Sequence, residues 1–158
     1  MFPAKCAVKW NGEKRNGDEA TAGRLRVKSR FYDHIDLRVR DRARAQQFYA
    51  RILPALGFTE DKSDDEWGTF YAAGEGKPPF FGFIEDVNHV PNGTRISFWA
   101  DSREEVDRVA ETVRQAGGKA LEGPALMREY TPDYYAFFFE DPDGNKLEIC
   151  YREKPNRS

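Results

Sequence analysis

The sequence predicts an α+β fold of two tandem βαβββ modules, related by pseudo-two-fold symmetry and forming a curled mixed sheet around a cavity. Three observations support this prediction. The order strand, helix cap, helix, glycine and three strands occurs twice, at an offset of 61 residues. The strand segments alternate apolar and polar residues, and each helical segment carries one apolar stripe. A repeated order of this kind indicates an internal duplication.

The first module is expected over about residues 31–86. Residues 31–39 alternate, with Ile35 and Leu37 on one face and His34 on the other, which predicts a strand. Asp41 is expected to cap a helix over about 42–56. The apolar stripe of that helix consists of Ala45, Phe48, Tyr49, Ile52, Leu53 and Leu56. Three strands should follow, at about 58–63, 67–73 and 79–85.

The second module is expected over about residues 94–152. Residues 94–100 alternate as a strand, and Ser102 with Glu105 forms the pattern of a capping box. The helix over about 103–116 carries the stripe Val106, Val109, Ala110 and Val113. Three strands should follow near 119–126, 134–140 and 146–152, with a turn at 141–145 between the last two.

Composition and charge suit one domain preceded by a basic arm. Residues 1–30 hold eight Lys or Arg against three acidic residues, which is +5, while the net charge of the whole chain is −2. We expect this arm to be poorly ordered and residues 31–158 to form the domain. An arm of this kind could bind a polyanion, but nucleic acid is not expected because a short basic arm without an element that enters a groove is weak evidence for it.

The sequence also bears on the cellular compartment. No apolar run approaches the length of a membrane span, and residues 1–10 lack the apolar centre of a signal peptide. Cys6 and Cys150 are the only cysteines and do not make a disulfide framework. We therefore expect a cytoplasmic protein without a membrane partner.

The strand faces opposite the helices carry ionisable and aromatic side chains. Those side chains are His34, Asp36, Arg38, Arg95, Trp99, Glu148, Cys150 and Arg152. They could simply face water, or the sheet could curl and enclose a polar-lined cavity. The mixture of large aromatics with ionisable groups favours the cavity.

Two stretches resemble a known family. The first is residues 31–39 with Phe48-Tyr49 and 56–58, and the second is residues 132–137 with 141–148. Together they resemble the glyoxalase/bleomycin-resistance/dioxygenase superfamily, also called the vicinal oxygen chelate fold. The resemblance covers about residues 31–152 and implies the fold more than an activity, because this superfamily hosts many chemistries.

The resemblance also implies positions for metal ligands, which in metal-dependent members come from the first and last strands of each module. His34 and Glu148 match two of these positions. Arg95 stands where a histidine is common, and the first-module counterpart of Glu148 falls on Phe80 or Gly82. The ligand set is therefore incomplete.

Two further side chains bear on this metal site. His89 lies between the modules, where a lone histidine is expected to be exposed. Arg95 could replace the metal by pairing with Glu148, or its stem could pack while its head reaches solvent.

Three functions follow from these residues. In the first, the protein binds a small organic ligand with no cofactor; Trp99, Tyr135 and Phe137 stack on it, and Arg38 or Arg95 meets an anionic group. In the second, it is a lyase, isomerase or dioxygenase whose Zn, Ni, Fe or Mn is bound by His34 and Glu148, with Glu148 as catalytic base. In the third, it is a non-catalytic interaction module that uses the arm. The resemblance implies a homodimer, in which the modules pair within one chain or swap between chains.

Overall fold

The computed structural model describes residues 32–153, so the expected N-terminal arm lies outside the described residues. The first module contains β1 (His34–Val39), α1 (Arg42–Ile52), the 3-10 turn η1 (Pro54–Leu56), β2 (Glu60–Asp61), β3 (Trp67–Tyr71) and β4 (Phe80–Glu85). The second contains β5 (Arg95–Trp99), α2 (Arg103–Ala116), β6 (Lys119–Leu126), β7 (Tyr135–Glu140) and β8 (Lys146–Tyr151). The predicted fold of two βαβββ modules is confirmed.

The strands form two mixed sheets of the same topology. Their orders are β1-β4-β3-β2 and β5-β8-β7-β6, and the pairs β1–β4 and β5–β8 are parallel. The other described strand pairs are antiparallel. In each module the first strand is therefore an edge strand that lies beside the last strand of the same module.

The helix ends follow from the capping residues. The Asp41 carboxylate accepts a hydrogen bond from the Arg44 N–H at 2.9 Å, and the Ser102 hydroxyl accepts one from the Glu105 N–H at 3.2 Å. Helix α1 ends at Ile52, earlier than the predicted residue 56. Pro54 has no N–H to continue the helix and instead starts the short turn η1.

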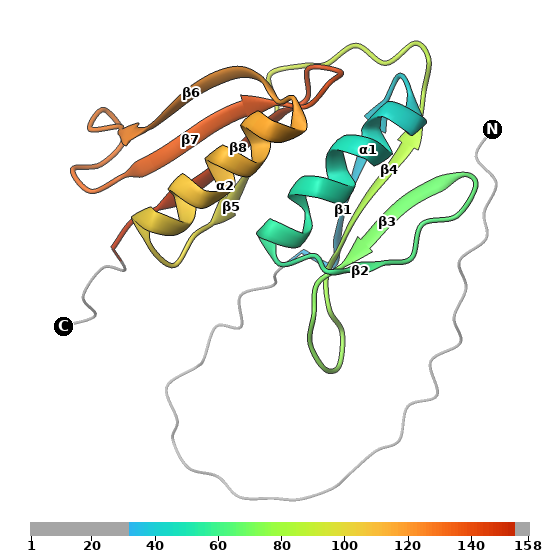
Figure 1. Cartoon of the computed structure of the whole chain (residues 1–158), viewed down its shortest axis with the longest axis horizontal. Helices are drawn as coiled ribbons and strands as arrows, with labels where there is room; N and C mark the ends of the chain where they lie inside the picture. Colours follow the sequence, from blue (N-terminus) through green and yellow to red (C-terminus); the bar gives the residue numbers. More distant parts are fainter. Residues whose placement is uncertain (1–31, 154–158) are drawn as a thin grey trace, which may run out of the picture. The chain divides into compact units, whose positions relative to one another are not determined.

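One hydrophobic core lies between the helices and both sheets. Helices α1 and α2 lie side by side over the sheets, as Figure 1 shows. Phe48 and Tyr49 from α1 and Phe137 from β7 belong to the same buried cluster. Because both modules contribute to this cluster, they share a core rather than fold around separate ones.

A polar clasp built around a buried acidic turn also joins the modules. It consists of Asp141 and Asp143 in the turn between β7 and β8, and of Arg40, Arg44 and Tyr49 in the first module. The Tyr49 hydroxyl donates to Asp141 at 2.8 Å, and the Arg40 N–H donates to Asp143 at 2.8 Å. The guanidinium groups of Arg44 and Arg40 pair with Asp143.

The environment of the clasp shifts the pKa values of two of its members. Burial opposes the charge on Asp143, but the Arg40 N–H and the two guanidinium groups together lower its pKa. Burial, and then the neighbouring Asp141, raise the pKa of the Tyr49 phenol, which remains a donor.

Within residues 32–153 no helix has the length and apolar character needed to cross a membrane.

Candidate ligand-binding site

Glu148 is a buried carboxylate on the face of the second sheet that points away from α2. It is only 5% exposed and accepts a hydrogen bond from the Tyr134 hydroxyl. Its neighbours across the sheet are Ser97 on β5 and Phe138 on β7. A small apolar cluster, separate from the main core, surrounds it and consists of Met127, Ala136, Phe138 and Cys150, with Ala125 and Tyr134 packed against it. We call this surface the Glu148 face.

Tyr134 is held as a donor at this face. Burial raises the pKa of its phenol, and hydrogen bonds to Cys150 and Glu148 raise it further. The hydroxyl therefore keeps its proton near neutral pH and satisfies one oxygen of the buried Glu148. Tyr134 was not among the residues expected at this site.

Arg95 lies on the same face but does not pair with Glu148, so this predicted ion pair is wrong. Its guanidinium carbon lies 4.5 Å from the centre of the Phe138 ring. Arg95 is opposite Lys146 in the ladder, whereas Glu148 is opposite Ser97. Because Tyr134 already bonds to the carboxylate and Phe138 stands beside it, the guanidinium stacks on the ring instead.

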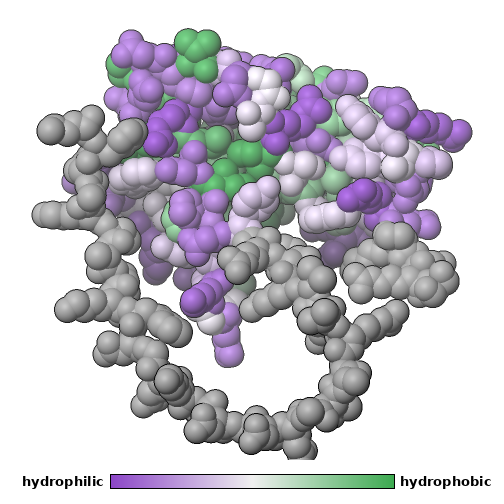
Figure 2. All heavy atoms as spheres, turned by 180° about the vertical axis from the view of Figure 1, so that it is seen from behind, coloured by the Kyte–Doolittle hydropathy of each residue, from purple (hydrophilic) through white to green (hydrophobic). Residues whose placement is uncertain are grey.

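Exposed aromatic side chains surround the Glu148 face. Trp99 is 65% exposed and carries the guanidinium of Arg152 over its ring at 4.8 Å. Tyr130 is 58% exposed and packs on Tyr134 with ring centres 5.3 Å apart. Figure 2 shows the side of the described chain away from the helices, where apolar residues gather near the middle and hydrophilic ones surround them.

Two aromatic residues expected at this face lie on the opposite one. The Tyr135 hydroxyl donates to Asp107 of α2 at 2.8 Å, and Phe137 is fully buried in the main core. Their assignment as ligand-stacking residues is therefore wrong. Strand β7 is aromatic on both faces, so its pattern did not reveal which residues face Glu148. The pairing of β7 with β8 does reveal them. Glu140 pairs with Lys146 across the turn, so Phe138 lies opposite Glu148.

The corresponding face of the first sheet has a different chemistry. The His34 ring stacks on Phe80 with centres 4.5 Å apart, and its Nδ1 lies 2.9 Å from the Asp33 carboxylate. Asp36 is opposite Gly82, just as Ser97 is opposite Glu148. Gly82 is therefore the first-module counterpart of Glu148, and it supplies no ligand.

A hollow of about 220 Å³ lies between the two edge strands β1 and β5. It is lined by both modules, including Arg38 from β1, Ile96 from β5 and Lys146 from β8. Arg38 also lies 3.5 Å from Asp36. His89, expected to be an exposed loop residue, is half-buried here, since its Nε2 lies 2.8 Å from the Asn145 side-chain oxygen. We call this hollow the seam pocket.

The contacts of these side chains bear on whether they could hold a divalent metal. Residues 32–153 contain no convergent group of three His, Cys, Asp or Glu side chains. Of the expected ligands, His34 is stacked on Phe80 and Glu148 is bonded to Tyr134. Arg95 brings a permanent positive charge to the position where a histidine ligand is common. The described part of a single chain therefore does not form a suitable metal site.

The chain belongs to the Glyoxalase/Bleomycin resistance protein/Dioxygenase superfamily, whose family model matches residues 32–149. A glyoxalase/bleomycin resistance protein from Albidiferax ferrireducens is 25% identical, with a TM-score of 0.61 over 77% of this chain and 98% of that one. The fosfomycin resistance protein FosX from Listeria monocytogenes is 21% identical, with a TM-score of 0.61 over 84% of this chain and 100% of that one.

A variant of the Listeria FosX was solved with Mn(II) and 1S,2S-dihydroxypropylphosphonic acid; it is 21% identical, with a TM-score of 0.56 over 77% of this chain and 90% of that one. At this level of identity the FosX likeness demonstrates a shared fold only. No curated protein matches the sequence.

Proposed function

We propose that the protein binds a small organic anion with a planar apolar part on the Glu148 face, and that it does so without a metal. One observation carries this proposal: Arg95 and Arg152 each lie over an aromatic ring, and neither forms an ion pair within residues 32–153. Stacked guanidinium groups keep their N–H edges available for a carboxylate or phosphonate.

The aromatic side chains would supply the apolar contact. Trp99 and Tyr130 are exposed beside this face, and their rings can stack on a planar group. Glu148 would contribute selectivity, because a buried carboxylate disfavours a second anionic group next to it and can accept a hydrogen bond from a ligand hydroxyl. Arg38 and Lys146, at the seam pocket, are further cations that an extended ligand could reach.

The alternative is a metal-dependent lyase, isomerase or dioxygenase with Glu148 as base, and one titration separates the two functions. Benzoate and phenylphosphonate would be titrated into the protein with EDTA, and then with Mn²⁺, Ni²⁺, Zn²⁺ or Fe²⁺, while Trp fluorescence is followed. We expect equal affinity in all conditions. Saturable binding that requires one metal per chain would favour the enzyme.

The contribution of the two cations can be measured in the same assay. We expect the double variant Arg95→Gln, Arg152→Gln to weaken binding about tenfold, which corresponds to about 1.4 kcal/mol. The double variant Lys77→Gln, Arg108→Gln removes the same charge from exposed positions outside this face and serves as the control. Equal loss in both variants would indicate a nonspecific charge effect and would contradict the proposal.

We also propose a homodimer, which family membership and the edge strands β1 and β5 support. The cytoplasmic location stays a prediction from the sequence. Light scattering on the full chain would test the dimer. Binding to heparin with and without residues 1–30 would test the remaining hypothesis, in which the basic arm makes an interaction module.

A further inference from the structure

A second hollow lies on the other side of the molecule, between α1 and the end of α2. Its volume is about 300 Å³, which is at the lower end of the range for small-molecule sites. Residues of α1 line one wall, and the opposite wall comes from the end of α2, the start of β6 and the β7–β8 turn. Both modules therefore build it. We call it the helix pocket.

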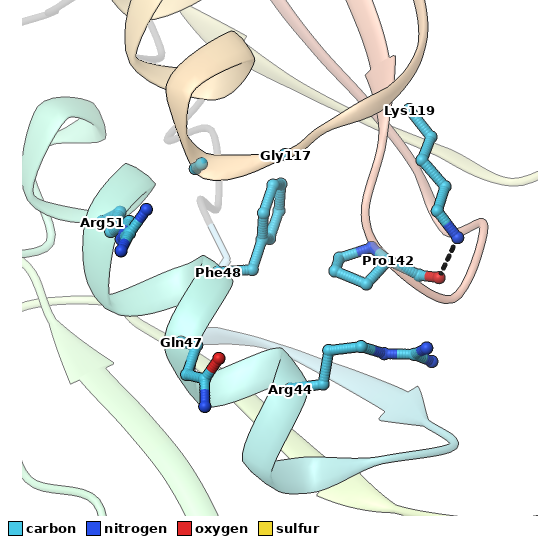
Figure 3. A pocket seen from close by; sticks show the side chains of 8 residues that line it. Arg44, Gln47, Phe48, Arg51, Gly117, Lys119 and Pro142 are labelled. Carbon is cyan, nitrogen blue, oxygen red and sulfur yellow. Dashed lines mark hydrogen bonds between the residues drawn. The ribbon is translucent and has the colours of Figure 1, made fainter.

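The helix pocket has an apolar floor and a basic rim. Figure 3 shows Phe48 pointing into it between Gly117 and Pro142, with Arg44 and Arg51 on the α1 side and Lys119 across from them. Phe48, Arg44, Gln47 and Arg51 are spaced along one face of the helix, so they line the pocket together. No acidic side chain is among its lining residues.

The charges of the rim leave about two positive charges for a ligand. Arg44 is already paired with Asp143. The Arg51 guanidinium donates to the Gln115 carbonyl oxygen at 3.4 Å, and the Lys119 ammonium donates to the Pro142 carbonyl oxygen at 2.8 Å. Neither cation lies within ion-pair distance of a carboxylate in the described part of the chain. Each keeps further N–H groups for a ligand.

We propose that the helix pocket binds a phosphate monoester with a small apolar group. At neutral pH such a monoester carries between 1.5 and 2 negative charges. Arg51 and Lys119, which lie on opposite sides of Phe48 in Figure 3, provide positive charge on both sides of the rim. The apolar group packs on Phe48 and Pro142, and the phosphate lies at the rim. Because the ligand contacts both modules, its binding stabilises their packing. This site is separate from the Glu148 face, so either proposal can fail alone.

The test uses phenyl phosphate and inorganic phosphate with the full chain, followed by amide NMR and thermal unfolding. We expect phenyl phosphate to shift the amides of residues 44–51 and 116–119, to bind at least tenfold more tightly than inorganic phosphate, and to raise the melting temperature by roughly 3 °C at saturation. Binding should weaken between pH 7 and pH 5, as the dianion takes up a proton.

Two variants locate the site without disturbing the core. Gln47 is exposed on the rim, so Gln47→Glu adds a nearly isosteric negative charge there and should weaken phenyl phosphate at least tenfold. Arg51→Gln with Lys119→Gln should do the same, whereas Lys77→Gln with Arg108→Gln should leave the affinity unchanged. Amide shifts confined to the Glu148 face, equal affinity for inorganic phosphate, unaltered binding by Gln47→Glu, or no saturation by about 10 mM would each overturn the proposal.

Discussion

At the scale of single residues, the site depends on how one buried carboxylate is satisfied. Glu148 accepts its hydrogen bond from Tyr134, while the nearby Arg95 stacks on Phe138. Because the Tyr134 hydroxyl bonds to the carboxylate and the Arg95 guanidinium stacks on a ring, the guanidinium forms no ion pair with Glu148 and stays available to a ligand. Whether Arg95 contacts Glu148 or Phe138 depends on its position in β5 and on the register of the neighbouring strands.

Tyr134→Phe tests this arrangement. Removing the hydroxyl leaves the buried Glu148 without this partner, so we expect the free energy of unfolding to fall by about 1–3 kcal/mol, as measured by urea unfolding at pH 7. Tyr135→Phe is the matched control, since its hydroxyl bonds to the exposed Asp107 and should cost less than about 0.5 kcal/mol. A loss of less than about 0.5 kcal/mol for Tyr134→Phe would mean that the Glu148 bond adds no net stability.

Asp143 gives a prediction for pH. Its pKa in the folded protein lies below the ordinary value of 3.8, so its stabilisation is present above that value and is lost as the pH falls through the folded pKa. We expect Asp143→Asn to reduce the free energy of unfolding by about 1–3 kcal/mol at pH 7 and by much less at pH 2. Urea unfolding at both pH values measures the difference, and the same loss at both would show that the charge of Asp143 is unimportant.

At the scale of elements, alternation and capping predicted most of the fold. The strands, both N-caps and the repeat could be predicted, because burial away from water and the geometry of the backbone produce local patterns in the sequence. The faces of β7 did not follow, because this strand is aromatic on both sides and its period is hidden. The Arg95 contact did not follow either, since it depends on the register between β5 and β8 and on Phe138 from a third strand.

The cap of α2 is a second element whose contribution can be measured. Ser102→Ala removes the acceptor for the Glu105 N–H, and we expect a loss of about 1 kcal/mol in thermal or urea unfolding. Thr94→Ala is a suitable control, because the Thr94 hydroxyl makes no hydrogen bond within the described residues. If Ser102→Ala proves neutral, the cap is replaced by solvent.

At the scale of the whole described domain, the shared core and the clasp make the two modules one cooperative unit. We expect a single unfolding transition for residues 31–158, with amides of β3 and β7 exchanging through the same global opening. Hydrogen exchange under native conditions measures this. Two separable openings, one for each module, would show that the interface between the modules is weaker than either half.

The clasp has a consequence for how the duplicated halves recognise each other. At the 61-residue offset, Arg40, Arg44 and Tyr49 of the first module correspond to Asp101, Glu105 and Ala110 of the second. Where one half presents two cations and a phenol, the other presents two acids and a methyl group. Two copies of the first half would lack the acidic turn of Asp141 and Asp143, and two copies of the second would offer that turn no basic partner. The two halves of the repeat are therefore a matched pair, in which each half is specific for its complement and cannot substitute for it.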